Sequence, residues 1–366
     1  MPKLKQIQNK IQKEGLDSFF FSSKANIFYM TYFSSSNAYV ILKPDEKYFI
    51  TDSRYYEGAK EKLKDWNVIE LDAGEKKGID HLRELINQLG GEKVGFEKDK
   101  VTISFYEKLL NKNSKEKKDR LHSHLIGYEG FLNEIRMVKT EEEINIIKQA
   151  VKKTDNIFKK LLKEIPKSKT ELDIRKKIIN YIFEEGGTGE SFPAIVASGE
   201  HSAIPHWETS SSSLKWNTFL LIDMGLIYKG YCSDFTRTIG LGKIDKELEK
   251  IYHIVKEAHE EATNVVKAGI PIGEIDLAAR RVIEKAGYKE YFIHSTGHGI
   301  GVEIHEEPRI YKTNQDLLQE NTVFTIEPGV YIPGKAGVRL ENIVVCRKDK
   351  AQVLTETDLE LRILER

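Results

Sequence analysis

Two segments of this chain carry almost the same pattern, an Asn-Thr pair followed by apolar residues, an acid and a glycine. The first runs from Asn217 to Gly225 (NTFLLIDMG) and the second from Asn321 to Gly329 (NTVFTIEPG), 104 residues further along the chain. Each is typical of a buried strand with one acid, Asp223 or Glu327. A carboxylate within an apolar run is costly to bury unless it is paired or binds a metal. The matching acids therefore predict a duplicated half-domain with a charged centre where the halves meet.

The repeat extends upstream of both strands. Residues 171–174 (ELDI) resemble residues 274–277 (EIDL), and an Ile-Pro pair precedes each of them, at Ile165 and at Ile270. Each half is therefore predicted to consist of a helix, an Ile-Pro turn, a second helix and then strands.

A hairpin after each strand is expected to bring a second acid opposite the first. A turn centred between Tyr228 and Lys229 would place Asp234 opposite Asp223. A turn around Gly334 would likewise place Glu341 opposite Glu327. Like charges directly opposite each other are destabilising unless a cation lies between them. The four acids thus predict a metal site, and the alternative is that each is paired with a lysine or arginine.

A histidine, His298, completes the expected ligand set. It lies in the segment His294–His305, which is too rich in glycine for a helix, and its glycines allow close approach of the backbone to a ligand. Four carboxylates and one imidazole without thiolates favour Mn²⁺ or Co²⁺, with Fe²⁺ or Zn²⁺ as alternatives. So many acids are too many for one ion, which predicts two. Cys232 and Cys346 are too distant in sequence for a metal-binding pair and are expected to pack as small apolar residues.

At these residues the sequence resembles the pita-bread metallopeptidases, the family of aminopeptidase P and prolidase, over essentially the whole chain. The five metal ligands of that family fall on Asp223, Asp234, His298, Glu327 and Glu341. Further residues of its proline-specific branch fall on His206, His294, His305 and Arg339. The resemblance implies an α/β N-terminal domain and an α+β pita-bread (creatinase/aminopeptidase) catalytic domain with an internal pseudo-twofold repeat.

The resemblance also implies a function, the hydrolysis of the Xaa-Pro bond at the N-terminus of dipeptides or short proline-containing peptides. Glu327 would then be both ligand and proton shuttle, and His305, His206 and His294 would be catalytic. Arg339 is expected to bind substrate.

Arg309 bears on substrate length, because prolidases of this family carry an arginine at the matching place. Its guanidinium would bind the C-terminal carboxylate of a dipeptide. A dipeptidase is therefore favoured over an aminopeptidase. The alternative is a surface arginine that pairs with Glu306 or Glu307.

Three other functions share the fold. A methionine aminopeptidase has the same five ligands but usually lacks so large an N-terminal domain and the pattern of His206 and Arg339. A creatinase-type amidinohydrolase, or a non-catalytic binding protein, is expected to have lost the ligands. Metal analysis of the purified protein separates the last two from a peptidase.

The N-terminal part, residues 1–127, alternates between helices and strands and is predicted to form an α/β domain with a mixed sheet. The catalytic domain is expected to span residues 128–366, and a capping box at Thr140–Glu143 opens its first long helix. Helices are expected at 3–14, 54–64, 79–89 and 102–110, and strands at 18–22, 38–42, 48–51, 68–71 and 93–96. The polar stretch 111–119 is typical of a solvated loop. By resemblance the N-terminal domain often shapes a partner subunit's site, which implies a homodimer.

Composition excludes several other classes. The chain has 57 basic and 57 acidic residues, so charge favours neither nucleic acid nor a membrane surface. Two cysteines, no signal peptide and no apolar run of membrane-spanning length indicate a cytoplasmic protein. His201, His253 and His259 are expected to be structural or surface residues, the last two on the solvated face of a charged helix.

Overall fold

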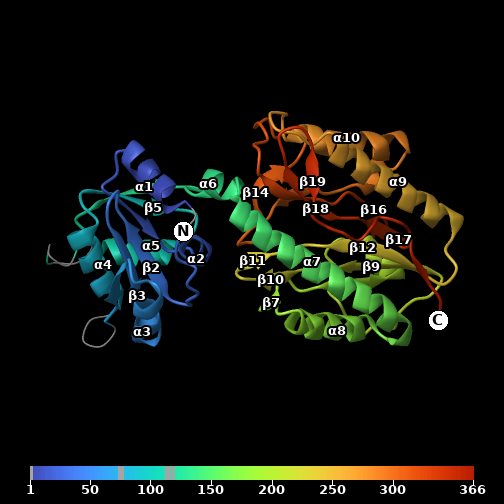
Figure 1. Cartoon of the computed structure of the whole chain (residues 1–366), viewed down its shortest axis with the longest axis horizontal. Coiled ribbons are helices and arrows are strands. Elements are labelled where there is room, and N and C mark those ends of the chain that lie inside the picture. The colour runs from blue at the N-terminus through green and yellow to red at the C-terminus, as the bar shows by residue number, and fades with distance from the viewer. Residues whose placement is uncertain (1–2, 73–77, 112–115, 117–119) are drawn as a thin grey trace. The chain divides into compact units, whose positions relative to one another are not determined.

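The computed structural model describes residues 3–72, 78–111, 116 and 120–366. It divides the chain into two compact units, Met1–Ile135 and Arg136–Arg366 (Figure 1). Most of the solvated loop expected at 111–119 lies outside the described residues. Among the described helices, none is both long and apolar enough to cross a membrane.

The first unit is built on a six-stranded sheet with the order β4-β3-β2-β1-β5-β6. Strand β1 is antiparallel to β2 and parallel to β5, which confirms the predicted mixed sheet. The elements are α1 Leu4–Lys13, β1 Ser18–Phe21, α2 Lys24–Thr31, β2 Ala38–Leu42, β3 Lys47–Thr51, α3 Ser53–Lys62, β4 Asn67–Glu70, α4 Gly78–Leu89, β5 Lys93–Glu97, α5 Ile103–Leu110 and β6 His124–Tyr128.

Every helix and strand predicted in this unit is present, and two elements were not predicted. Helix α2 is buried along Asn26, Ile27, Tyr29, Met30 and Thr31, so its sequence has no one-sided apolar stripe to detect. Edge strand β6 crosses the expected domain boundary between residues 127 and 128.

The second unit contains two pairs of long helices and the strands between them. Short helix α6 Asn133–Met137 spans the division between the units. The elements that follow it are α7 Glu141–Glu164, η2 Ile165–Lys167, α8 Glu171–Glu184, β7 Gly189–Glu190, β8 Ile195–Ser198, η3 Gly199–Ala203, β9 Thr218–Asp223, β10 Leu226–Tyr228, β11 Tyr231–Cys232, β12 Thr236–Leu241, α9 Lys246–Asn264, α10 Gly273–Lys285, η4 Lys289–Tyr291, β13 Gly297–Gly299, β14 Glu306–Ile310, β15 Val323–Ile326, β16 Gly329–Ile332, β17 Ala336–Arg339, β18 Asn342–Cys346, β19 Ala351–Val353 and β20 Ile363–Leu364.

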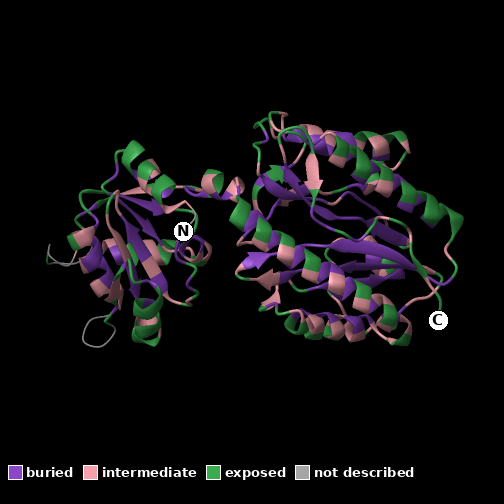
Figure 2. Cartoon of the chain, viewed as in Figure 1, coloured by how far each residue is buried: buried purple, intermediate pink, exposed green. Residues whose placement is uncertain are grey.

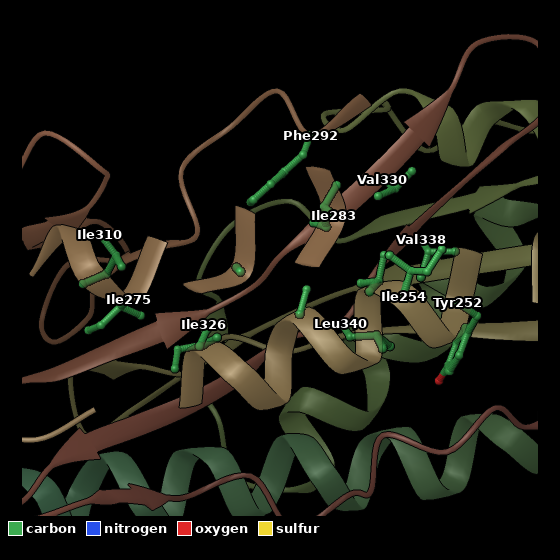
Figure 3. Packing of buried hydrophobic residues seen from close by; sticks show 14 of the residues in the cluster. Tyr252, Ile254, Ile275, Ile283, Phe292, Ile310, Ile326, Val330, Val338 and Leu340 are labelled. Carbon is green, nitrogen blue, oxygen red and sulfur yellow. The ribbon is translucent and has the colours of Figure 1, made fainter. Parts of the chain in front are cut away.

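The two halves have the predicted order of elements. Helix α7 begins with the predicted capping box, and α8 follows the Ile-Pro turn as α10 follows the second one. Helices α7 and α8 pack on the apolar side of β9 and β12, whereas α9 and α10 pack on β15 to β18. Figure 3 shows residues of the second of these cores, among them Tyr252 and Ile283 from the helices and Ile326 and Val338 from the strands.

Alternation along the strands decides which side chains face away from the helices. Leu220 and Ile222 belong to the core under α7 and α8, so Asp223 projects from the opposite face of β9. By the same rule Ile326 packs against α9 and α10, and Glu327 projects away from them. These strands therefore have an apolar face toward the helices and a second face that carries the acids. Figure 2 shows that most of their residues are buried.

The repeated Asn-Thr pairs have a conformational cause. Asn217 and Asn321 both have positive φ, 62° and 68°, a region that asparagine tolerates better than most residues. Each donates its backbone N–H to the last residue of a neighbouring strand, Leu241 or Cys346. The repeat thus marks the same entry into the strand in both halves.

The predicted register of the first hairpin was wrong. Tyr228 pairs with Tyr231, so the turn residues are Lys229 and Gly230, with φ of 49° and 79°. A two-residue turn of this kind needs positive φ at both positions, and glycine supplies it at the second. Asp223 consequently lies opposite Thr236 and not opposite Asp234.

Candidate metal centre

The second hairpin has the predicted register. Ile326 lies opposite Asn342 in β15 and β18, and Gly329 lies opposite Arg339 in β16 and β17. The pairing on both sides therefore places Glu327 directly opposite Glu341, at the point where the two pairs of strands meet.

Three potential ligands from both halves converge at this point. Ligand atoms of Asp234, His298 and Glu341 all lie within 4.8 Å of one another. The Nε2 atom of His298 is 3.5 Å from Oδ2 of Asp234 and 3.4 Å from Oε1 of Glu327. Asp234 therefore lies with the other acids although the predicted register of the first hairpin was wrong. The observed partner of Asp223 is two residues further along the strand, and a shift of two residues keeps a side chain on the same face.

Two carboxylate oxygens in this cluster are buried without a hydrogen-bond partner among the described residues, Oδ1 of Asp223 and Oε1 of Glu341. The other oxygens of these groups are occupied. Asp223 Oδ2 accepts from Arg339, and Glu341 Oε2 accepts from the Thr236 hydroxyl at 2.7 Å. Because an unpartnered buried carboxylate oxygen is costly, the arrangement fits a cation that both free oxygens would bind.

The pKa values of the acids agree with this fit. Burial raises the pKa of Asp234 and Glu341 well above their ordinary values, and repulsion from the neighbouring carboxylates raises them further. Burial also raises the pKa of Glu327 to about 7. A divalent cation would reverse these shifts, since it favours the ionised form of each acid.

His298 is oriented toward the acids by its backbone and by Thr325. Its Nδ1 lies 3.1 Å from the carbonyl oxygen of Gly299, which assigns the proton to Nδ1 and leaves the lone pair of Nε2 for a ligand. Its backbone N–H donates to the Thr325 hydroxyl, which donates in turn to Glu327 at 3.1 Å. One hydroxyl therefore sets the positions of two potential ligands.

Arg339 is buried, and the structure shows it in contact with protein groups. Its guanidinium donates to Asp223 Oδ2, to the Tyr331 hydroxyl at 2.8 Å, and to the Thr236 hydroxyl at 3.3 Å. A weaker contact of 3.4 Å reaches the carbonyl oxygen of Pro205. Arg339 therefore holds the carboxylate of Asp223 in place.

Tyr331 is a site residue that was not predicted. Its hydroxyl accepts from Arg339 and lies 2.8 Å from Nε2 of His294, to which it donates. Nδ1 of His294 lies 2.7 Å from the Ser295 carbonyl, so the ring is neutral with its proton on Nδ1. Burial and the nearby Arg339 lower the pKa of His294 to about 3. A signal existed in the sequence, because Tyr331 follows Glu327 by four residues, and an even spacing along extended chain places two side chains on the same face.

The two remaining histidines are more exposed. The ring of His305 lies edge-on to that of His298, with centroids 4.3 Å apart. Partial burial lowers the pKa of His305, and the neighbouring His298 lowers it further. His206 lies near enough to affect the pKa values of His294, His305 and Glu327. The structure thus brings all three predicted histidines to the acid cluster.

Arg309 lies directly opposite His298 in the antiparallel pair of β13 and β14. Its side chain is exposed, and its guanidinium carbon lies 4.9 Å from the ring of Tyr311. The carboxylate of Glu306 is bound instead by Arg136 and Lys139. Within the described part of the chain, the guanidinium of Arg309 forms no ion pair with Glu306 or Glu307.

The expectation of a solvated face was wrong for one histidine of α9. His259 is 1% exposed, and burial lowers its pKa to about 3, whereas His253 is exposed as expected. Charged neighbours in the sequence concealed that His259 shares the buried stripe of Tyr252 and Val255. Cys232 and Cys346 are buried and unpaired, which confirms that they pack as apolar residues.

Two family models match this chain. The model of metallopeptidase family M24 matches residues 145–348, and that of the creatinase/prolidase N-terminal domain matches residues 3–138. The Xaa-Pro dipeptidase of Pyrococcus furiosus is 34% identical, over 98% of this chain and 99% of the relative.

Two solved structures show the same architecture. The Xaa-Pro dipeptidase from Bacillus anthracis superposes with a TM-score of 0.90 at 33% identity, over 99% of both chains. The X-Pro aminopeptidase from Thermotoga maritima superposes with a TM-score of 0.87, also at 33% identity, over 97% of this chain and 100% of its own. Similarity of this extent covers both units and the whole acid cluster.

Proposed function

This chain belongs to metallopeptidase family M24, and we propose that it hydrolyses the Xaa-Pro bond at the N-terminus of dipeptides or short peptides. The family match confirms a metal-dependent peptidase, and the superpositions confirm the predicted two-part fold with its pita-bread catalytic domain. The observation that carries the proposal is the convergence of four acids and His298 beside three further histidines. A methionine aminopeptidase is not favoured, because the creatinase/prolidase N-terminal domain is present.

The ligand set is proposed to hold two divalent ions, Mn²⁺ or Co²⁺, with Fe²⁺ or Zn²⁺ as alternatives. The proposed ligands are Asp223, Asp234, His298, Glu327 and Glu341. When bound, the ions polarise the scissile carbonyl and lower the pKa of a water molecule. The free oxygens of Asp223 and Glu341 and the lone pair of His298 support this assignment.

Glu327 is proposed to carry the proton between the attacking water and the leaving nitrogen of proline. Its carboxylate accepts a hydrogen bond from the Thr325 hydroxyl and lies 3.4 Å from Nε2 of His298, which fixes it beside the other proposed ligands. The nitrogen of a proline leaving group must gain a proton for the bond to break, so a nearby acid is required.

The exposed histidines are proposed to serve the substrate. His305 and His206 border the acids from the accessible side and can donate hydrogen bonds to the tetrahedral oxyanion. His294 has both ring nitrogens engaged with Tyr331 and Ser295, so its proposed part is to keep this chain of hydrogen bonds in register. Arg339 is proposed to orient Asp223, and its predicted contact with substrate stays a prediction.

Substrate length is proposed to depend on Arg309, with a dipeptidase favoured over an aminopeptidase. The side chain lies on the strand paired with His298, and its guanidinium is free of the two nearby glutamates. It can therefore bind the carboxylate that a dipeptide presents directly after its proline ring. We further propose a cytoplasmic homodimer, which the two buried thiols and the family resemblance support.

The test is a kinetic comparison of three peptides by the Mn²⁺-loaded protein, Xaa-Pro, Xaa-Pro-Xaa and Xaa-Ala. Preference for Xaa-Pro over both others supports the dipeptidase, and preference for Xaa-Pro-Xaa transfers the proposal to an aminopeptidase. Equal cleavage of Xaa-Ala and Xaa-Pro would overturn the proline assignment. Sedimentation of the purified protein tests the homodimer.

A further inference from the structure

The repeated ELDI and EIDL segments contain one fully buried acid in each half, Glu171 at the start of α8 and Asp276 in the first turn of α10. These two are not at matching positions of the repeat. The counterpart of Asp276 is Asp173, which completes the capping box of α8. The counterpart of Glu171 is Glu274, a half-exposed residue that pairs with Arg281. Each half therefore buries a different member of the same pair.

Glu171 collects hydrogen bonds from the end of β8, from helix η3 and from the irregular loop that follows them. Its Oε1 accepts from the Ser198 backbone at 2.9 Å and from His201 Nδ1 at 2.8 Å. Its Oε2 accepts from Trp207 Nε1 at 3.0 Å and from the Ser210 hydroxyl at 3.4 Å. Rings of His201 and Trp207 stack at 3.9 Å between centroids. The carboxylate therefore joins both ends of the loop that carries His206.

Asp276 has the same relation to the other histidine segment. Its Oδ1 accepts from the Thr296 backbone at 3.0 Å and hydroxyl at 2.6 Å, and its Oδ2 accepts from Arg280 and from the Lys312 backbone. Arg280 donates onward to the carbonyl oxygen of His294. The carbonyl oxygen of Thr296 accepts from the backbone N–H of Glu327 at 2.7 Å. Two hydrogen bonds, both through the backbone of Thr296, thus connect Asp276 to the proposed ligand Glu327.

We infer that Glu171 and Asp276 are positioning residues, one in each half, that hold the histidine-bearing segments of the site. This inference rests on the proposed function of that site. A buried carboxylate with several donors fixes each donor in place, because any that moves away leaves an unsatisfied group inside the protein. An apolar side chain could fill the same volume, but it would leave the backbone N–H groups of Ser198 and Thr296 without an acceptor.

A double-mutant cycle tests the first arm of this inference, the positioning role of Glu171. Glu171→Gln keeps one acceptor oxygen and turns an NH₂ toward the remaining donors, so kcat/KM for Xaa-Pro is expected to fall about 10- to 100-fold. If the effect acts through His206, the same change in a His206→Ala background should cost less than about 2-fold. Asp173→Asn, which alters only the cap of the same helix, is the matched control and should leave kcat/KM nearly unchanged.

An equal cost of Glu171→Gln in both backgrounds would overturn this arm, since a purely structural residue acts independently of His206. If Glu171→Gln does not fold, Trp207→Phe removes a single donor and replaces it in the cycle. Its expected cost is about 2- to 5-fold, again absent without His206.

Metal affinity tests the second arm without using turnover. Asp276→Asn should weaken Mn²⁺ binding about 10-fold or more by calorimetric titration, because outer contacts orient the ligands. Glu274→Gln is the matched control and should bind Mn²⁺ as the native protein does. Unchanged affinity in Asp276→Asn would overturn the arm. A further outcome is that the native protein cleaves no Xaa-Pro peptide while Asp276→Asn weakens Mn²⁺ binding and Glu274→Gln does not. That outcome would refute the proposed function and support the positioning role of Asp276.

Discussion

Asp223 is bound by Arg339 through only one of its two carboxylate oxygens. Its Oδ2 accepts from the guanidinium, whereas its Oδ1 is buried and has no hydrogen-bond partner in the described part of the protein. The arginine thereby offsets part of the repulsion among the acids and leaves the second oxygen of Asp223 available to a cation. Arg339 belongs to β17 of the second half and Asp223 to β9 of the first, so this ion pair also joins the halves.

We expect Arg339→Lys to lower kcat/KM for Xaa-Pro by roughly 100-fold while the protein remains folded. Lysine keeps the charge but cannot contact Asp223, Tyr331 and Thr236 together, since it lacks the planar fork of arginine. Steady-state kinetics and circular dichroism measure the two effects. Arg281→Lys, at an exposed ion pair, serves as the control. Native activity in Arg339→Lys would show that the three contacts are dispensable.

Chelation should abolish peptide hydrolysis, and Mn²⁺ or Co²⁺ should restore it. The expectation follows from the orphaned oxygens of Asp223 and Glu341, which a cation satisfies. Elemental analysis should find close to two ions per chain in the active protein and close to none after dialysis against the chelator. Full activity in metal-free protein would be incompatible with the proposed ligand set.

Glu327→Gln should reduce kcat by roughly 1,000-fold or more without unfolding the protein. The amide is nearly isosteric, but it cannot take up a proton, and only its oxygen can bind a cation. Turnover of Xaa-Pro at saturating substrate is the measurement. Glu307→Gln, on an exposed residue of β14, is the matched control. A variant with substantial turnover would exclude Glu327 as the proton carrier.

The same substitution should stabilise the metal-free protein at neutral and higher pH. The folded-state pKa of Glu327 is raised from 4.5 to about 7, so between these values the folded state binds more protons than the unfolded state. Stability of the native protein therefore falls as pH rises through this window. The advantage of Glu327→Gln should grow as the pH rises from 4.5 to about 7, and the shift of Glu327 corresponds to about 3 kcal/mol.

Urea unfolding of both chelated proteins across this pH range measures that advantage. Buried histidines such as His259 and His294 are common to both proteins, so their own pH dependence cancels in the difference. A difference that does not change with pH would mean that Glu327 has an ordinary pKa in the folded protein.

Arg309→Ala should raise KM for Xaa-Pro by roughly 10-fold, the loss of one charge-assisted contact, and should barely change cleavage of Xaa-Pro-Xaa. Lys312→Ala removes a neighbouring exposed cation that also lies near Tyr311, and it is the matched control. An equal response of both substrates, or none, would remove Arg309 as the determinant of substrate length and favour the aminopeptidase.

Local pattern was enough to predict most of the elements and the second hairpin. Strand alternation and the glycine at position 334 depend on a few neighbouring residues, so the pairing of Glu327 with Glu341 followed from spacing. The prediction for the first hairpin was wrong for an equally local reason. Its turn uses Lys229 and Gly230, and the choice between adjacent turns depends on backbone angles that spacing does not reveal.

The sequence by itself determined the repeated strands, their acids, the histidine-rich segment and hence the chemistry of the site. Only the tertiary structure decided which partner each buried polar group obtains. The position of Tyr331 between Arg339 and His294 depends on contacts between separate segments of the second half. The burial of Glu171 instead of its repeat counterpart Glu274 depends likewise on the segment from Ser198 to Ser210. Such partners lie far apart along the chain, and packing selects them because every buried donor and acceptor must be satisfied at once.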